Sequence, residues 1–87
     1  MNKPRVYTIN SCPYCHELKE LLKKENIDFI EVNVDLNENA DEYNKLVEFI
    51  KRDDVPVVKI GAKILVPEFS FKSINECFTT IKKLLIN

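Results

Sequence analysis

The apolar residues of this chain follow two different periods, and the first is typical of strands. They alternate with polar residues or run together in four short segments, at positions 5–9, 28–34, 55–60 and 63–66. Such segments predict strands, because successive side chains of a strand point to opposite faces of its sheet. Gly61 and Ala62 separate the last two segments, and a glycine in first place suits a two-residue type II′ hairpin turn.

The second period is that of a helix face. Positions 13–24 carry leucines at this spacing, and Asn26 is expected to end the helix that they predict. A second helix is expected to begin at a capping box, in which Asn39 caps a backbone N–H and Glu42 reaches back. It continues to about Arg52, with core positions at Tyr43, Leu46, Val47 and Ile50.

The last part of the chain predicts a third helix. Ser73 and Glu76 form another capping box at its start. Its apolar stripe consists of Ile74, Cys77, Phe78, Ile81, Leu84 and Leu85.

The order of the expected elements is βαβαββα. A strand, a helix and a strand joined by short connections make a parallel pair with a right-handed crossover. We therefore expect an α/β fold in which three helices flank a four-stranded mixed sheet. At 87 residues the chain is expected to be a single domain, 1–87, that buries about 60–65% of its unfolded surface.

Composition narrows the classes of function. The chain has 13 Lys and Arg residues against 14 Asp and Glu, a net charge of −1, and the signs are mixed. It lacks the basic patch that binds nucleic acid. No apolar stretch is long enough for a membrane span, and Met1 to Arg5 shows no signal-peptide core. Three cysteines, two of them close together, suit a reducing compartment, so we expect a cytoplasmic protein and a monomer.

Two cysteines separated by two residues stand where the first strand passes into the first helix. A Cys-x-x-Cys at such a junction is typical of a thiol–disulfide redox site. Pro13 suits the first helical position, which places Cys12 at the helix N-terminus. Unpaired N–H groups and the helix dipole favour a thiolate there. We predict that Cys12 is the nucleophile and that Cys15, one turn further on, is the resolving thiol.

A structural zinc half-site is the alternative for this pair. Zinc takes four ligands, and only Cys77 and His16 remain to complete a set. Cys77 falls on an apolar helix face, where free cysteine acts as a small hydrophobic residue. His16 is expected at the helix surface, although it could tune the charge of the thiolate. We therefore expect no metal.

Three features together resemble the glutaredoxins. They are Tyr7-Thr8, the sequence Cys12-Pro13-Tyr14-Cys15, and Val55-Pro56 followed by a hairpin. The resemblance covers nearly the whole chain. It implies a thioredoxin-like fold with a cis peptide before Pro56, facing the cysteines, and a Val55 backbone that pairs with substrate.

The resemblance also implies the ligand and its partners. Tyr14 would flank the sulfurs, glutathione would be the reductant, and no cofactor would be bound. Glutaredoxins that hold an iron–sulfur cluster usually have Gly-Phe-Ser after the first cysteine, so Pro13-Tyr14-Cys15 argues against a cluster.

Three departures concern glutathione. Ile9 stands where the family commonly has lysine, and Asp54 where it usually has threonine. The family's Gly-Gly followed by Asp, which binds the γ-glutamyl end, is replaced by residues 66–73. Phe69 and Phe71 in this stretch are expected to pack in the core, or else to form an apolar lip around the cysteines. Groups that could replace the missing contacts are Lys51, Arg52, Ser70 and Ser73.

The function expected is that of a dithiol oxidoreductase, which reduces protein or glutathione mixed disulfides. The first alternative is a redoxin that a flavoprotein reductase reduces and that delivers electrons to one dedicated protein. A metal-binding module is the second alternative.

Overall fold

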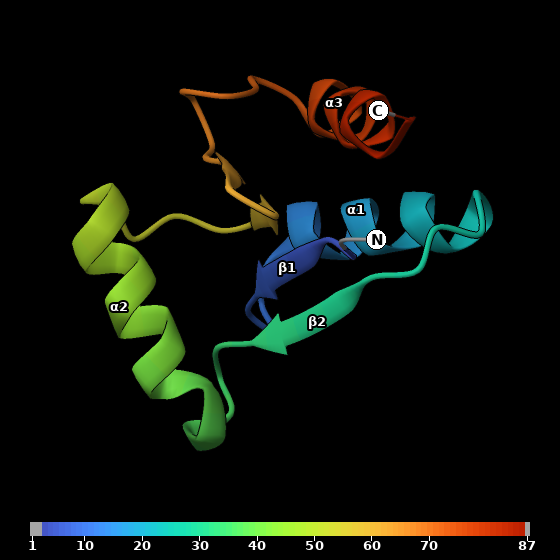
Figure 1. Cartoon of the computed structure of the whole chain (residues 1–87). Helices are drawn as coiled ribbons and strands as arrows, with labels where there is room; N and C mark the ends of the chain where they lie inside the picture. Colours follow the sequence, from blue (N-terminus) through green and yellow to red (C-terminus); the bar gives the residue numbers. More distant parts are fainter. Residues whose placement is uncertain (1–2, 87) are drawn as a thin grey trace.

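A four-stranded sheet forms the centre of the computed structural model, which describes residues 3–86 (Figure 1). The strand order is β2-β1-β3-β4. β1 is parallel to β2 and antiparallel to β3, and β3 is antiparallel to β4. The strands are β1 Arg5–Thr8, β2 Ile30–Asn33, β3 Val57–Ile60 and β4 Lys63–Leu65. The mixed sheet is as predicted, and each strand is one to three residues shorter than its sequence pattern.

Helices cover both faces of this sheet. One face carries α1 and α3, and α2 lies on the other (Figure 1). Between β2 and α2 the chain makes a short 3₁₀ helix, η1 Asn37–Asn39. Within residues 3–86, no helix has the length and apolarity that a membrane crossing requires. The α-helices are α1 Pro13–Lys24, α2 Ala40–Ile50 and α3 Ile74–Ile86.

The alternation along the strands explains why the core has two parts. In β1, Val6 is buried against α1 and α3, whereas its neighbour Tyr7 is buried against α2. In β3, Val58 is likewise buried against α1 and α3, and Val57 is buried against α2. A central strand with both faces covered therefore needs apolar residues at successive positions, which is what both strands have.

The end of α1 confirms the stop predicted at Asn26. This residue has a φ of 57°, which is the left-handed conformation that Asn tolerates better than most residues. Its N–H donates to the Lys23 carbonyl at 3.1 Å, and the Ile27 N–H donates to the Leu22 carbonyl at 2.9 Å. This pair of bonds is a Schellman motif, which satisfies carbonyls at the helix end.

The capping box predicted for α2 is wrong. The Asn39 side chain makes no cap bond and donates instead to the Asn33 carbonyl at 2.8 Å. The Glu42 carboxylate accepts bonds from the Arg5 guanidinium at 2.8 Å and from the Tyr7 hydroxyl at 2.6 Å. A charge-assisted pair that also satisfies a buried hydroxyl is stronger than a bond to an exposed backbone N–H.

The capping box predicted for α3 is half right. The Ser73 hydroxyl accepts the Glu76 N–H at 3.1 Å, as predicted. The Glu76 carboxylate reaches one residue further back than expected, to the Lys72 N–H at 2.6 Å.

Cys77 lies fully buried between α3 and the sheet, as the apolar stripe predicts. Burial raises the pKa of its thiol from 9.0 to about 12. A raised pKa of an acidic group means that the folded state holds the proton more tightly than the unfolded chain. Its stabilising contribution is therefore complete below pH 9.0 and is lost as the pH rises toward 12.

We predict that Cys77→Ala flattens this alkaline loss of stability. The slope of the free energy of unfolding against pH should fall by up to about 1.4 kcal/mol per pH unit. Urea denaturation at a series of pH values between 9.0 and 12 measures it. Thr79→Ala, an exposed change on the same helix, is the control and should keep the original slope. Parallel curves for Cys77→Ala and the unaltered protein would contradict the prediction.

Candidate active site

The loop between β1 and α1 places Cys12 at the start of the helix. Cys12 is the N-cap residue, with φ −99° and ψ 105°, and Pro13 is the first residue of α1. The Cys12 N–H donates to the Ile9 carbonyl at 3.3 Å, which closes the turn. Pro13 has no N–H to satisfy, and its fixed φ is already helical. The start of the helix is therefore as predicted.

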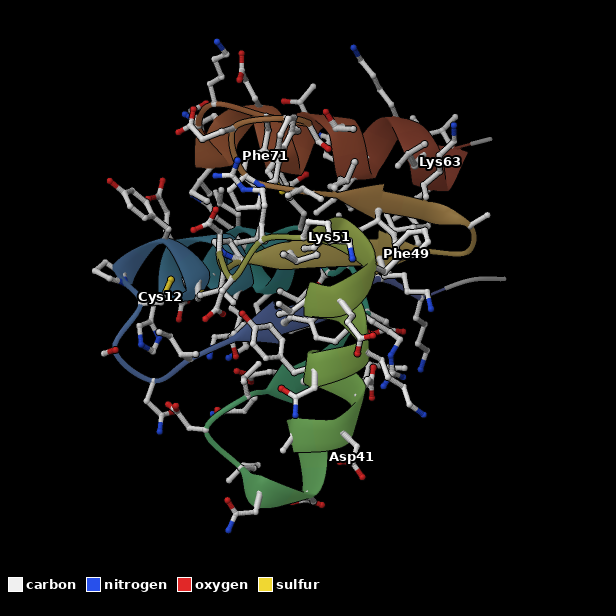
Figure 2. The ribbon with its side chains drawn as sticks, turned by 90° about the vertical axis from the view of Figure 1, so that its left-hand side faces the viewer. Cys12, Asp41, Phe49, Lys51, Lys63 and Phe71 are labelled. Carbon is white, nitrogen blue, oxygen red and sulfur yellow. The ribbon has the colours of Figure 1, made fainter. Side chains whose placement is uncertain are left out.

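The two cysteines of the pair have different surroundings. The Cys15 N–H donates to the Cys12 Sγ at 3.1 Å, so a sulfur caps α1 where other helices use a Ser or Asp oxygen. Cys12 retains 7% of its surface exposed at the edge of the molecule, whereas Cys15 is fully buried (Figure 2). Charged acceptors make stronger bonds to backbone N–H groups than neutral acceptors do, and a helix N-terminus adds to this preference.

Cys15 is held as a neutral thiol. Burial and then the hydrogen bond with Cys12 raise the pKa of Cys15 to about 12. At neutral pH Cys15 therefore stays protonated.

The segment between α2 and β3 lies against Cys12. The Val55–Pro56 peptide bond is cis, as the resemblance implies, and Pro56 is buried. The Val55 carbonyl oxygen lies 3.9 Å from the Cys12 Sγ. Just upstream, Asp53 accepts a hydrogen bond from the Tyr43 hydroxyl of α2. Burial, followed by this bond, raises the pKa of Tyr43, so its hydroxyl remains a donor and anchors the segment to α2.

A groove of about 550 Å³ lies beside the segment that contains the cis peptide bond between Val55 and Pro56. Of the residues predicted to flank the sulfurs or to hold substrate, five line it: Tyr14, Arg52, Val55, Pro56 and Ser73. The groove therefore brings together residues of α1, of the segment before β3 and of the start of α3.

Two other predicted binding residues lie elsewhere. Lys51 ends α2 in the left-handed conformation, with a φ of 62°, and is exposed (Figure 2). The Ser70 hydroxyl accepts the Val66 N–H at 2.9 Å, so it is bonded within its own loop. Neither residue lines the groove.

Several residues of the groove were missed by the sequence reading. Glu17 lies three residues after Tyr14 on α1, and this helical spacing could have found it. Glu68 and Lys72 belong to the irregular stretch after β4, which carries no periodic signal. Glu68 has a φ of 72°, in a tight turn closed by its N–H to the Phe71 carbonyl at 2.9 Å.

Arg52 is paired inside this groove. Its guanidinium lies 2.6 Å from the Asp54 carboxylate and 4.9 Å above the centre of the Phe69 ring. The Phe69 side chain is 76% exposed, whereas Phe71 is buried in the core. Phe71 therefore packs in the core, which was the first expectation for the two phenylalanines. Phe69 instead lies at the surface beside the groove.

His16 lies at the surface of α1, as expected. The imidazole of His16 is exposed, and its Nε2 lies 2.9 Å from the Asn10 carbonyl oxygen in the loop before Cys12. Among residues 3–86, no group of three or more His, Cys, Asp and Glu side chains is placed to hold a metal ion.

The fold and the cysteine pair define a class of protein. The βαβαββα order, the four-stranded mixed sheet and the Cys12–Cys15 pair are those of a thioredoxin-like redox protein. The crystal structure of one thioredoxin-like protein superposes with a TM-score of 0.69 and 25% identity, covering 95% of this chain and 99% of that one.

The sequence comparisons give the family. The glutaredoxin family profile matches residues 5–65, so the chain belongs to the glutaredoxin family. An uncharacterised glutaredoxin-like 8.6 kDa protein of the rubredoxin operon of Clostridium pasteurianum is 37% identical over 62 residues, 71% of this chain and 80% of that protein. Glutaredoxin 3 of Escherichia coli K12 is 33% identical over 63 residues, 72% of this chain and 74% of its own length.

The asymmetry of the cysteines predicts a single site of alkylation. In the folded, reduced protein at neutral pH, iodoacetamide should modify Cys12 and leave Cys15 and Cys77 intact, since both are fully buried thiols with a pKa of about 12. Peptide mapping by mass spectrometry measures the site. Unfolding in urea should expose all three cysteines. Equal modification of Cys12 and Cys15 in the folded protein would contradict the prediction.

Proposed function

We propose that this glutaredoxin-family protein reduces disulfides with Cys12 as nucleophile and Cys15 as resolving thiol. The observation that carries the proposal is the Cys12 Sγ at the N-cap of α1, where it accepts the Cys15 N–H at 3.1 Å. The attacking sulfur is thereby held at the surface end of the pair, and the second sulfur is held behind it, one helical turn further on.

The reaction balances as two thiol–disulfide exchanges. The Cys12 thiolate attacks one sulfur of the substrate disulfide, and the other substrate sulfur leaves as a thiolate that takes up a proton. Cys15 then loses its proton and attacks the Cys12 Sγ. The Cys12–Cys15 disulfide forms, the second substrate thiol is released, and two electrons have passed to the substrate.

The raised pKa of Cys15 supports this order of events. Part of the increase comes from the hydrogen bond with Cys12. Once Cys12 is bonded to substrate, its sulfur is no longer a thiol or thiolate, so this contribution changes at the step where Cys15 must react. A resolving thiol that stays protonated until then does not compete for substrate.

The electron donor has two candidates. Glutathione is the reductant expected from the family, and Tyr14, Val55, Pro56, Arg52 and Ser73 would contact it in the groove. The second candidate is a flavoprotein reductase, with a dedicated protein as the electron acceptor. It is favoured by the Arg52–Asp54 ion pair, which occupies a guanidinium that a glutathione carboxylate would need. We place either activity in the cytoplasm, in a monomer of a single domain.

Cysteine variants test the roles of the pair. Cys12→Ser should reduce disulfide-reducing activity to the uncatalysed rate, because no other thiol reaches the surface end of the site. Cys15→Ser should lose reduction of protein disulfides but keep removal of glutathione from a mixed disulfide, since a second glutathione can resolve the intermediate. Activity of Cys12→Ser equal to that of the unaltered protein would refute the proposal. Cys77→Ala is the matched control and should keep both activities, because Cys77 lies in the core behind α3.

A second assay separates the two donors. NADPH consumption is followed with a small mixed disulfide, in one arm with glutathione and glutathione reductase and in the other with thioredoxin reductase alone. We expect turnover in only one arm. Turnover with glutathione alone would exclude the reductase-dependent alternative, and turnover with thioredoxin reductase alone would exclude glutathione as the donor.

A further inference from the structure

One cation of the groove, Arg52, is already paired with a carboxylate of the protein. The Arg52 Nε and a terminal guanidinium nitrogen lie 2.7 and 2.6 Å from the same Asp54 oxygen. Both side chains are about one-third to one-half exposed, so the pair borders the groove and is not sealed inside the protein. A substrate carboxylate that approached Arg52 would have to displace Asp54 or tolerate its charge.

The start of α3, which also borders the groove, carries its own carboxylate. Glu76 accepts the Lys72 N–H at 2.6 Å, and the Ser73 hydroxyl accepts the Glu76 N–H at 3.1 Å. The N–H groups at the start of a helix attract anions. Here the Lys72 N–H just before α3 and the Glu76 N–H of its first turn are already bonded to side chains of the protein.

The charged residues that line the groove give it a net negative charge. The described residues that line it include the carboxylates of Glu17, Asp54 and Glu68, against the cations of Arg52 and Lys72. Three negative charges against two positive charges leave the lining at −1. With Arg52 and Asp54 paired, the carboxylates of Glu17 on α1 and Glu68 after β4 outnumber the one remaining cation, Lys72.

We propose that this groove selects disulfide substrates that carry a positive charge next to the reacting cysteine, and that it disfavours anionic ones. The inference rests on the proposed function and names its substrate class, a protein or peptide disulfide flanked by Lys or Arg. Asp54 is the specificity-determining residue, because it occupies the guanidinium that an anionic substrate would otherwise use, and Glu17 and Glu68 add negative charge to the lining. Cys12 and Cys15 supply two electrons, and the substrate disulfide becomes two thiols.

Peptide disulfides of matched structure test the selection. Two symmetric disulfides of a short capped peptide are prepared, with Lys after the cysteine in one and Glu in the other. Oxidation of the reduced protein is followed in a single turnover by acid quench, alkylation and mass spectrometry, without any reductase. Each rate is divided by the rate of the same peptide with dithiothreitol, which removes differences in intrinsic reactivity.

We expect the unaltered protein to react about fivefold faster with the Lys peptide at low ionic strength, and the preference to shrink in high salt. Asp54→Asn should lower or invert the ratio, because Arg52 is then available to a carboxylate. Glu17→Gln removes one carboxylate from the lining of the groove, so it should lower the ratio about two- to fivefold. Glu20→Gln removes one charge from α1 outside the groove and should leave both rates unchanged.

The outcomes separate this inference from the function on which it rests. Equal normalised rates for the two peptides, or a preference for the Glu peptide, would overturn charge selection while leaving the oxidoreductase intact. A shift in Glu20→Gln as large as that in Asp54→Asn would also overturn it, since only overall charge would then matter. If neither peptide oxidised Cys12 and Cys15 faster than it oxidises dithiothreitol, the proposed function itself would fail.

Discussion

The structure of the site depends on one contact, the hydrogen bond from the Cys15 N–H to the Cys12 Sγ at 3.1 Å. It makes a sulfur the N-cap of α1, so the position of the Cys12 sulfur and the start of the helix are set by the same interaction. Every other part of the site is arranged around that sulfur. Pro13 begins the helix without leaving an unsatisfied N–H, and Cys15 is buried in the interior. The Val55 carbonyl oxygen lies 3.9 Å from the Cys12 Sγ.

Polar contacts between elements hold this arrangement on the sheet. At the end of β1, the Thr8 hydroxyl donates to Glu31 of β2 at 2.8 Å, and Lys19 of α1 pairs with the same carboxylate at 2.8 Å. Burial acts to raise the pKa of Glu31, but the bonds from Lys19 and Thr8 outweigh it and lower the pKa. One carboxylate therefore ties β1, β2 and α1 together just before the loop that carries Cys12.

The groove shows how one family site can be adapted without changing its chemistry. The cysteine pair and the cis proline are present as in the glutaredoxin family to which the chain belongs. The charged groups beside them bond within the protein: Arg52 pairs with Asp54, and Glu76 accepts the Lys72 N–H. Since the exchange reaction needs only the sulfurs, the surrounding charges can change the preferred substrate while the reaction stays the same.

The sequence by itself determined the elements, their order and the cysteine pair, because these follow from local rules. The rules are the apolar runs of β1 and β3, the alternation around β2, the leucine spacing of α1, and Asn26 at its end. Tertiary structure decided which partner each polar group takes. Glu42 fits a local capping box, yet it bonds Arg5 and Tyr7 from a distant strand, since a buried hydroxyl and a guanidinium offer stronger bonds. Likewise, the sequence could indicate Arg52 as a binding residue, but it could not show that the Arg52 guanidinium already forms an ion pair with Asp54.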